Sequence, residues 1–315
     1  MMNTPLVSIC VIAYNSSKTI IQTLESVKIQ TYENIELIIS DDGSTDDTVK
    51  ICNNWIKENR KLNYRLQLIT IDYNTGVPSN CNRAIEACRG KWVKLIAGDD
   101  CLMKNCISDF IDYINTNRTC EIVFSNYYPF TEITKKIELK ELKFIDEQML
   151  CFSEMNTKEQ LRYYIEHAIN ITPSLFYTKA LIKCYGGFDE KYKLFEDTPM
   201  IIKLLKSGVH IEYMPSPTVL YRISQESITR MGDNRYFYKT SFIDCILQFK
   251  RDQIWSLYNW YNVLFWIKEF SFLTQYKFTT VVLKNRRNKK TEIIYNLFKI
   301  LNPYYLLGYL KKKLK

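Results

Sequence analysis

The sequence predicts an α/β protein built on a single, mostly parallel sheet that is flanked by helices. Within about the first 100 residues, short apolar runs alternate with segments of helical periodicity, an order typical of parallel strands joined by right-handed crossovers. The composition is globular, since 46% of the 315 residues are hydrophobic and 24% are charged. This length is enough for one large α/β domain or two smaller ones.

Four near-continuous apolar runs are the predicted strands of the first half, because strands covered on both faces of a sheet lose their polar alternation. Three segments between them carry apolar residues every three or four positions, which predicts helices. In chain order, these elements are strand 6–13, helix 15–30, strand 35–40, helix 46–60, strand 64–71, helix 77–90 and strand 91–97. Pro78 near its start and Gly90 at its end delimit the third helix.

Beyond residue 100 the alternation loosens. Residues 130–170 are charged and irregular, and we expect them to form a variable insertion. From about residue 234 onward the pattern is helical, aromatic and basic. The remaining expected elements are helix 106–117, strand 121–128, strand 171–178, helix 179–185, helix 197–208, strand 209–215 and strand 218–224.

The net charge of +9 is unevenly distributed along the chain. Residues 277–315 contain eleven Lys or Arg and one acidic residue, Glu292, which gives +10. Such a segment indicates contact with an anionic surface, a membrane or a nucleic acid, or simply a solvated tail. No nucleic-acid recognition module is visible. The longest uncharged apolar stretch nearby, 253–267, has 15 residues and is short for a membrane span.

Ten cysteines are scattered along the chain without a C-x-x-C pair, and there are only two histidines. A structural zinc site is therefore not expected, and free thiols in a reducing cytoplasm are the simpler interpretation. The N-terminal segment has no basic region before its first strand, so we expect no signal peptide. Together with the basic tail, this predicts a cytoplasmic protein at the inner face of the membrane.

Polar clusters follow three of the predicted strands. Tyr14 and Asn15 come after the first strand, Asp41 and Asp42 after the second, and the pair 99–100 after the fourth. Ligands of open α/β sheets bind at the carboxyl ends of strands. Each cluster taken alone could equally be a helix cap or a turn. Three on one edge favour a binding site.

A glycine-rich phosphate loop is absent, because the segment "YNSSKT" after the first strand contains no glycine and no P-loop occurs elsewhere. Adjacent aspartates at a strand end suit Mg²⁺ or Mn²⁺ held by carboxylates and ligand phosphates. Asp99 and Asp100 could supply this site. Asp41 and Asp42 would then be free to contact a base or a ribose.

Several ordered motifs resemble glycosyltransferase family 2, the inverting GT-A enzymes that use nucleotide-sugars. They are "VSICVIAYNSSKTIIQTLESVKIQTYENIELIISDDGSTDDT", "NTGVPSNCNRAIEACRGKWVKLIAGDD", "TPSLFYTKALIKCYGGFDEKYKLFEDTPMIIKLLKSG" and "YRISQESIT". Together they cover roughly residues 5–100 and 171–229. The resemblance is to the members that assemble bacterial surface polysaccharides, and it implies a GT-A fold with a helical, basic C-terminal extension.

The resemblance implies a role for each residue that matches a family motif. Asp42 would bind the nucleobase and Tyr14 would stack near it, while Asp99 would contact ribose or diphosphate. Asp100 would ligate the Mn²⁺ or Mg²⁺ that bridges the diphosphate, and Asp197 would be the general base. Further donor-binding positions are Ala13, Asn15, Asn74, Gly76 and Asn82, and possible supporting positions are Asp41, Arg83, Glu196 and Arg222.

Inverting transfer agrees with these residue types, because a carboxylate must take the proton of the acceptor hydroxyl while a metal stabilises the leaving diphosphate. Asp197 could also be only a helix cap beside Pro199. Two positions depart from the family pattern: Cys81 stands where many members have arginine, and Ser224 where many have histidine. Metal binding would then rest on Asp100, phosphate and water.

The predicted organisation is a catalytic domain over 1–230 and a C-terminal region over 231–315. The former has a nucleotide-binding half, 1–100, and an acceptor half, 101–230. The expected reaction moves a sugar from a nucleotide-sugar, expected to be a UDP-sugar, to a saccharide or lipid-linked acceptor. The alternatives are a degenerate sugar-nucleotide- or membrane-binding module, and a nucleotidyltransferase, which would need the missing glycine-rich loop. Residues 277–315 would contact an anionic membrane.

Overall fold

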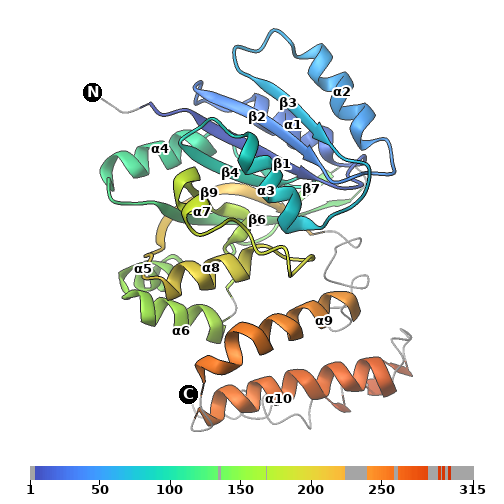
Figure 1. The fold of residues 1–315 in the computed structure, drawn as a ribbon, viewed down its shortest axis with the longest axis vertical. Coiled ribbons are helices and arrows are strands. Elements are labelled where there is room, and N and C mark those ends of the chain that lie inside the picture. Colours follow the sequence, from blue (N-terminus) through green and yellow to red (C-terminus); the bar gives the residue numbers. More distant parts are fainter. Residues whose placement is uncertain are drawn as a thin grey trace. The chain divides into compact units, whose positions relative to one another are not determined.

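The chain forms two compact units, Met1–Ser224 and Gln225–Lys315. We describe them separately from a computed structural model (Figure 1). The described residues are 4–133, 136–167, 169–223, 240–258, 262–282, 290, 291, 293, 294, 297 and 298. The predictions made for Ser224 and for most of the basic tail therefore fall outside the described residues.

Within the described residues, nine strands form one sheet in the first unit. The order is β3 (Leu66–Thr70), β2 (Ile35–Asp41), β1 (Val7–Ala13), β4 (Trp92–Ala97), β8 (Phe176–Thr178), β6 (Ile122–Ile133), β9 (Glu212–Arg222) and β5 (Cys101–Leu102), with β7 (Lys136–Leu139) paired to β6. Strands β3, β2, β1 and β4 are mutually parallel, as predicted. Beyond β4 the sheet is mixed, because β8 is antiparallel to both of its neighbours while β6 and β9 run parallel.

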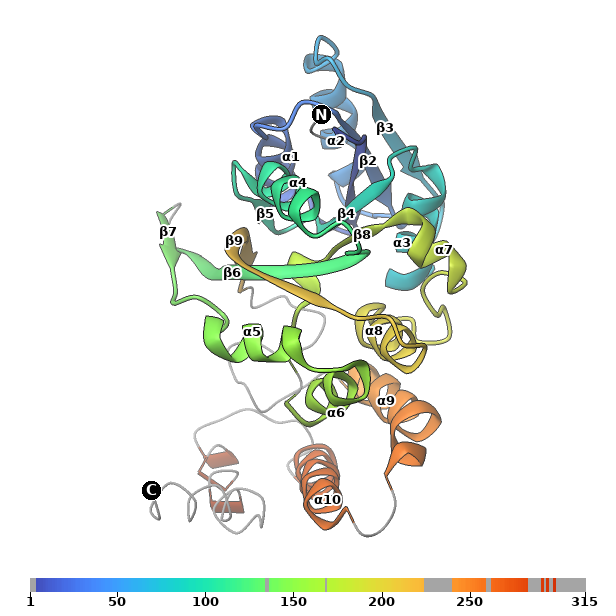
Figure 2. The same cartoon turned by 90° about the vertical axis from the view of Figure 1, so that its left-hand side faces the viewer.

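Helices cover both faces of this sheet. The chain moves outward from β1 to β3 and then returns to place β4 beside β1, so α3 must cross on the face opposite α1. Figure 2 shows α1 and α4 on one side of the sheet and α3 and α7 on the other. The helices are α1 (Ile20–Lys28), α2 (Thr48–Glu58), α3 (Val77–Ala87), α4 (Cys106–Thr116), α5 (Asp146–Glu154), α6 (Thr157–His167), α7 (Lys179–Cys184) and α8 (Asp197–Lys206). The predicted α/β class is confirmed.

Two segments differ from the sequence prediction. The stretch expected to be irregular, 130–170, contains β7, α5 and α6 within its described part. The two strands expected over 209–224 are a single strand, β9. Its two prolines are tolerated because the pairing of β6 with β9 shifts register around Asn126, where Pro217 lies opposite.

The described part of the second unit is helical, with α9 (Thr240–Phe249) and α10 (Val263–Lys277) as its longest elements. Glu269 of α10 is buried and accepts hydrogen bonds from Lys250 Nζ (2.5 Å) and Trp255 Nε1 (3.1 Å). This buried ion pair ties α10 to the turns after α9. Among the described residues, no helix combines the length and the hydrophobicity that crossing a bilayer requires.

Candidate active site

The carboxyl ends of β2, β1 and β4 lie side by side because these strands are neighbours in the sheet. The backbone N–H of Asp42 donates to the Ala13 carbonyl (3.0 Å), and that of Gly98 donates to Ile12 (2.9 Å). The residues that follow each strand are thereby held at one edge. The structure thus brings the three polar clusters of the sequence together where α/β sheets bind ligands.

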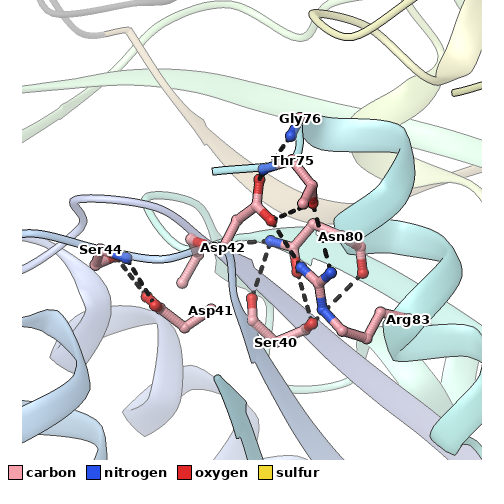
Figure 3. Close-up of polar contacts among 9 residues, drawn as sticks. Ser40, Asp41, Asp42, Ser44, Thr75, Gly76, Asn80 and Arg83 are labelled. Atoms are coloured by element: carbon pink, nitrogen blue, oxygen red, sulfur yellow. Dashed lines mark hydrogen bonds and ion pairs between the residues drawn. The ribbon is translucent and has the colours of Figure 1, made fainter. Parts of the chain in front are cut away.

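Asp42 is 2% exposed, and its carboxylate accepts four hydrogen bonds (Figure 3). The donors are Thr75 N–H (3.0 Å), Thr75 Oγ1 (2.6 Å), Gly76 N–H (2.8 Å) and Arg83 Nη2 (2.7 Å). A carboxylate has about four lone-pair positions, so this set is complete. It offsets the cost of burying the charge. A nucleobase N–H can reach Asp42 only if one donor withdraws.

Arg83 is the donor best suited to withdraw. It has the longest side chain of the set and is partly exposed, whereas the other three donors belong to the loop before α3. Its buried Nε has no hydrogen-bond partner within the part of the chain that the structure describes. The guanidinium is therefore incompletely satisfied in this state, and an additional acceptor from a ligand would compensate it.

Asn80 ties α3 to the ends of two strands (Figure 3). Its Nδ2 donates to the carbonyls of Ala13 (3.2 Å) and Ser40 (3.0 Å), and its Oδ1 accepts from Ser40 Oγ (2.6 Å) and Arg83 Nη2 (3.1 Å). Sequence reasoning missed both Asn80 and Thr75. A signal for Asn80 was present, because a polar residue stands on the face of the predicted helix that carries its apolar positions.

Asp41 and Asn15 shape loops beside this network. The buried Asp41 carboxylate accepts from the N–H (2.8 Å) and the hydroxyl of Ser44. Asn15, at φ 50°, donates its N–H to Ser44 Oγ (2.8 Å) and accepts from Thr45 N–H (2.8 Å). Both residues are therefore held within turns, whereas Tyr14 is 44% exposed and leaves its ring free to stack on a ligand.

Asp99 and Asp100 differ in their surroundings. Asp100 is 3% exposed, and its Oδ1 accepts the backbone N–H of Arg222 (2.7 Å). Burial, and then the charge of Asp99, raise the pKa of Asp100 well above its usual value. Asp99 is less buried, and among the described residues no other side chain donates to its carboxylate. Asp99 is thus the more exposed carboxylate of the pair, while the bond from Arg222 occupies only one oxygen of Asp100.

The carboxyl end of β4 can bind a divalent cation if the ligand and water supply part of its coordination. Among the described residues, no three His, Cys, Asp or Glu side chains gather closely enough to hold a metal alone. Mg²⁺ and Mn²⁺ are commonly held by one or two carboxylates together with substrate phosphates and water. Asp99 and Asp100 provide such carboxylates, so the residues fit a metal ion that binds together with a diphosphate.

Asp197 is the first residue of α8, and its carboxylate accepts a hydrogen bond from Thr172 Oγ1. Thr172 opens a short 3₁₀ turn, Thr172–Ser174, whose Pro173 carbonyl accepts from Lys94 Nζ (2.7 Å). Lys94 is fully buried in β4, and burial lowers its pKa to about 8. The sequence reading missed Thr172 and Lys94, although a lysine inside an apolar strand was a visible signal.

The loop before Asp197 contacts the start of α3, since the Val77 N–H donates to the Lys193 carbonyl (3.0 Å). Burial, and then the charges of Glu196, Asp197 and Asp42, raise the pKa of the Cys81 thiol well above its usual value. Cys81 itself is buried in α3. Burial, followed by the charge of Asp197, also raises the pKa of Glu196 to about 8.

Asn82, Gly76 and Asn74 were predicted to bind the donor. Asn82 exchanges two hydrogen bonds with the backbone of Phe188 (2.8 and 2.9 Å) and therefore anchors the loop before α8. Gly76 has φ 100°, and a Cβ there would lie 2.7 Å from the Lys193 carbonyl, so only glycine fits. Asn74 is exposed beside Thr75.

This fold and site define a GT-A glycosyltransferase: a half built on parallel strands, carboxylates at its strand ends, and a further carboxylate at the start of α8. The sequence profile of Glycosyl transferase family 2 matches residues 8–185, and the chain belongs to that family.

Named relatives agree with this assignment. Glycosyltransferase GlyG of Streptococcus pneumoniae is 25% identical over 230 residues, which are 71% of this chain and 73% of GlyG. The Escherichia coli enzyme WfaP, named as a UDP-Glc:alpha-D-GlcNAc-diphosphoundecaprenol beta-1,3-glucosyltransferase, is 39% identical over 123 residues, 39% of this chain and 46% of WfaP. The match therefore spans less than half the length of WfaP.

Solved structures share the fold. TarS 1–349 of S. aureus in complex with UDP-GlcNAc superposes with a TM-score of 0.54 at 18% identity, covering 84% of this chain and 79% of TarS. The mannosyltransferase PcManGT of Pyrobaculum calidifontis, in complex with GDP-Man and Mn2+, has a TM-score of 0.54 at 16% identity, covering 71% of this chain and 59% of PcManGT.

Proposed function

We propose that this family 2 glycosyltransferase moves a sugar, with inversion, from a UDP-sugar to a saccharide or lipid-linked saccharide in bacterial surface-polysaccharide synthesis. The observation that carries the proposal is the placement of Asp197: the loop before it is bonded to the start of α3 by the Val77 N–H and the Lys193 carbonyl (3.0 Å), next to Gly76, whose N–H binds Asp42. A base and a nucleotide-binding carboxylate so placed suit transfer between two substrates. The names of WfaP and of the TarS complex support the donor and acceptor classes.

In the proposed reaction, Asp197 accepts the proton of the acceptor hydroxyl as its oxygen bonds to the anomeric carbon. The bond from that carbon to the diphosphate oxygen breaks, and its electron pair leaves with the nucleoside diphosphate. Asp42 and Arg83 hold the nucleobase, and Tyr14 stacks on it. A divalent cation would stabilise the charge on the leaving diphosphate.

Asp100 stays the proposed metal ligand, as the resemblance implies, and the more exposed Asp99 is proposed to contact the ribose or diphosphate. The bond from the Arg222 N–H to Asp100 Oδ1 holds β9 beside residues 98–100. Ser224 lies outside the described residues, so the prediction that metal binding does without a histidine there stays a prediction. The division into a catalytic domain over 1–230 and a C-terminal region over 231–315 is likewise part of the proposal.

The C-terminal region would bring the enzyme to an anionic membrane, where a lipid-linked acceptor resides. Residues 277–315 carry a charge of +10, since eleven Lys or Arg accompany one Glu. In the described part of α10, Val263, Leu264 and Phe270 are exposed apolar residues. Basic residues together with exposed apolar side chains favour an interfacial location.

A donor screen tests the proposed function. Purified protein is heated with Mn²⁺ and UDP-glucose, UDP-GlcNAc or GDP-mannose, and any donor that stabilises it is assayed for hydrolysis and transfer. A ligand at 100 times its Kd adds about 2.7 kcal/mol to the free energy of unfolding. Stabilisation by a UDP-sugar with turnover supports the proposal. Binding without any turnover would favour the degenerate module, and no response to any nucleotide-sugar would contradict both.

A further inference from the structure

Helix α1 and the residues at its two ends carry polar side chains that bind the segment around the acidic turn, residues 98–100. Thr19, Thr23, Ser26 and Gln30 are spaced four, three and four residues apart, which places them on one helical face. Thr23 is completely buried and Ser26 nearly so. Buried helix faces are normally apolar, and buried polar groups need partners. This polar stripe therefore has a structural purpose beyond ordinary packing.

The partners of the polar stripe are backbone groups of four residues in the segment 98–103. Each stripe residue makes one hydrogen bond to this segment. The bonds are Thr19 Oγ1 to the Gly98 carbonyl (2.8 Å), Thr23 Oγ1 to the Asp100 carbonyl (2.7 Å), Leu102 N–H to Ser26 Oγ (3.0 Å) and Gln30 Nε2 to the Met103 carbonyl (2.9 Å). The stripe thus binds the segment along its length. Between the carbonyls of residues 98 and 100, which it binds, the Asp99 carbonyl receives no hydrogen bond from the stripe.

Arg222, at the end of β9, occupies this gap. Its Nε donates to the Asp99 carbonyl (2.7 Å), and its backbone N–H donates to Asp100 Oδ1 (2.7 Å). The guanidinium is held in turn by Glu132 (2.6 Å) and lies 4.5 Å from the Phe130 ring centroid. The side chain is only 8% exposed. Three successive carbonyls, of residues 98, 99 and 100, therefore each accept a hydrogen bond from a side chain.

We propose that Thr19, Thr23 and Arg222 are positioning residues that hold the backbone of residues 98–100 so that the carboxylates of Asp99 and Asp100 meet the metal-bound diphosphate of the donor. The inference rests on the proposed function. A carbonyl fixed on each side of Asp99 prevents rotation of the peptide units that carry it. The Asp99 carboxylate, which no other described side chain engages, is then oriented before the ligand arrives, and residues that orient a metal ligand contribute strongly to affinity.

The test uses Thr23→Val and Arg222→Lys in the full-length protein. The first removes the bond to the Asp100 carbonyl at nearly constant shape, and the second keeps the charge but loses the fork of donors. Calorimetry with UDP and Mn²⁺ should show about 10- to 100-fold weaker binding in each, the usual effect of losing such support. Ser26→Ala is the matched control, since it removes a bond of the same stripe beyond the acidic turn. We expect it to stay within about threefold of wild type.

Hydrogen exchange of the peptide containing residues 98–103 gives a readout independent of the metal. Thr23→Val and Arg222→Lys should both speed exchange at 99–101 without ligand. Thr19→Val replaces Thr23→Val if the latter does not fold. Unchanged affinity and unchanged exchange in the folded variants would overturn the inference. A wild-type protein that binds no UDP with Mn²⁺ would instead contradict the proposed function. The rate of hydrogen exchange at residues 99–101 would still show whether these side chains hold that backbone in place.

Discussion

Asp197 combines a structural position with a chemical one. It begins α8, where a negative charge is favoured by the helix N-terminus, and it accepts a hydrogen bond from Thr172. The N-cap position itself is Glu196, so Asp197 is not the helix cap that the sequence allowed but a first-turn carboxylate, and this role is compatible with catalysis. Substitutions that preserve its shape can separate the two.

Asp197→Asn should abolish transfer while leaving donor binding intact. The amide keeps the shape but cannot accept the acceptor's proton, and general-base catalysis contributes about 10² to 10⁴ in rate. Turnover and calorimetric affinity for the UDP-sugar, measured on the same preparation, check this. Near-native turnover in a folded variant would leave Asp197 with only a structural role in the first turn of α8.

Thr172→Val should lower kcat about 10- to 100-fold with little change in KM for the donor, because its hydroxyl positions the base rather than contacting the nucleotide. Thr172→Ser, which retains the hydroxyl, should restore most of the rate. Steady-state kinetics of the three proteins provide the measurement. If valine and serine variants behave alike, the hydrogen bond has no part in catalysis.

Glu196 should make the fold less stable as pH rises. Its pKa is about 8 in the folded protein and near 4.5 when unfolded, so the folded state holds the extra proton between these values. The free energy of unfolding should therefore fall as pH increases through this window. Glu196→Gln should be more stable than wild type at pH 8.5, by at least about 1 kcal/mol, or about 2–4 °C in Tm. The advantage should vanish near pH 4.5, and a constant difference across the range would contradict the assignment.

Individual residues also show how far the sequence could predict the site. The place of Asp42 at the end of a buried strand was predictable, because apolar periodicity defines the strand and its end. Its four donors were not, since Thr75, Gly76 and Arg83 come from another loop and helix, and only the folded chain brings them together. The unequal burial of Asp99 and Asp100 likewise depends on β9, more than 100 residues away in sequence.

Among the elements, the parallel strands and their helices were predictable, whereas α5 and α6 were not. Each of these two helices buries few side chains, Met149 and Phe152 in α5 and Gln160 and Tyr164 in α6. So small an apolar face leaves no clear period in a charged segment. Besides the packing of Phe152 on Phe124, polar contacts hold the start of α5, and they centre on one buried asparagine of β6.

Asn126→Ala should destabilise the protein without altering the candidate site at the carboxyl ends of β1, β2 and β4. The completely buried side chain donates to the Phe144 carbonyl (3.1 Å) and Asp146 Oδ1 (3.0 Å) and accepts from two backbone N–H groups. Each orphaned buried group costs about 1–3 kcal/mol, so a loss of at least about 2 kcal/mol is expected in urea unfolding. Asn54→Ala, on the exposed side of α2, is the control and should stay within about 0.5 kcal/mol. A similarly small effect in Asn126→Ala would mean that α5 is held by other contacts.

At the scale of the whole molecule, charge is separated along the chain. The net charge is +9, of which residues 277–315 contribute +10, so the remainder is close to neutral. An anionic surface would therefore attract the C-terminal region but not the nearly neutral remainder of the chain. Binding by this region should depend on salt, because exposed charges are screened over about 8 Å at physiological ionic strength.

Replacing Lys311, Lys312 and Lys313 together by glutamate should release the full-length protein from anionic vesicles. The charge of residues 277–315 would fall from +10 to +4, since each replacement changes it by two. Each basic residue near an anionic surface contributes about 1 kcal/mol, so three lost lysines should weaken partitioning by about two orders of magnitude. Flotation with phosphatidylglycerol vesicles, at low and high salt, measures this.

The control variant changes Lys50, Lys57 and Lys61, which are exposed in and just after α2, to glutamate and has the same net charge. Equal loss of flotation in both variants would mean that only total charge matters. Retained flotation in both would assign the contact to apolar side chains such as Phe270 of α10.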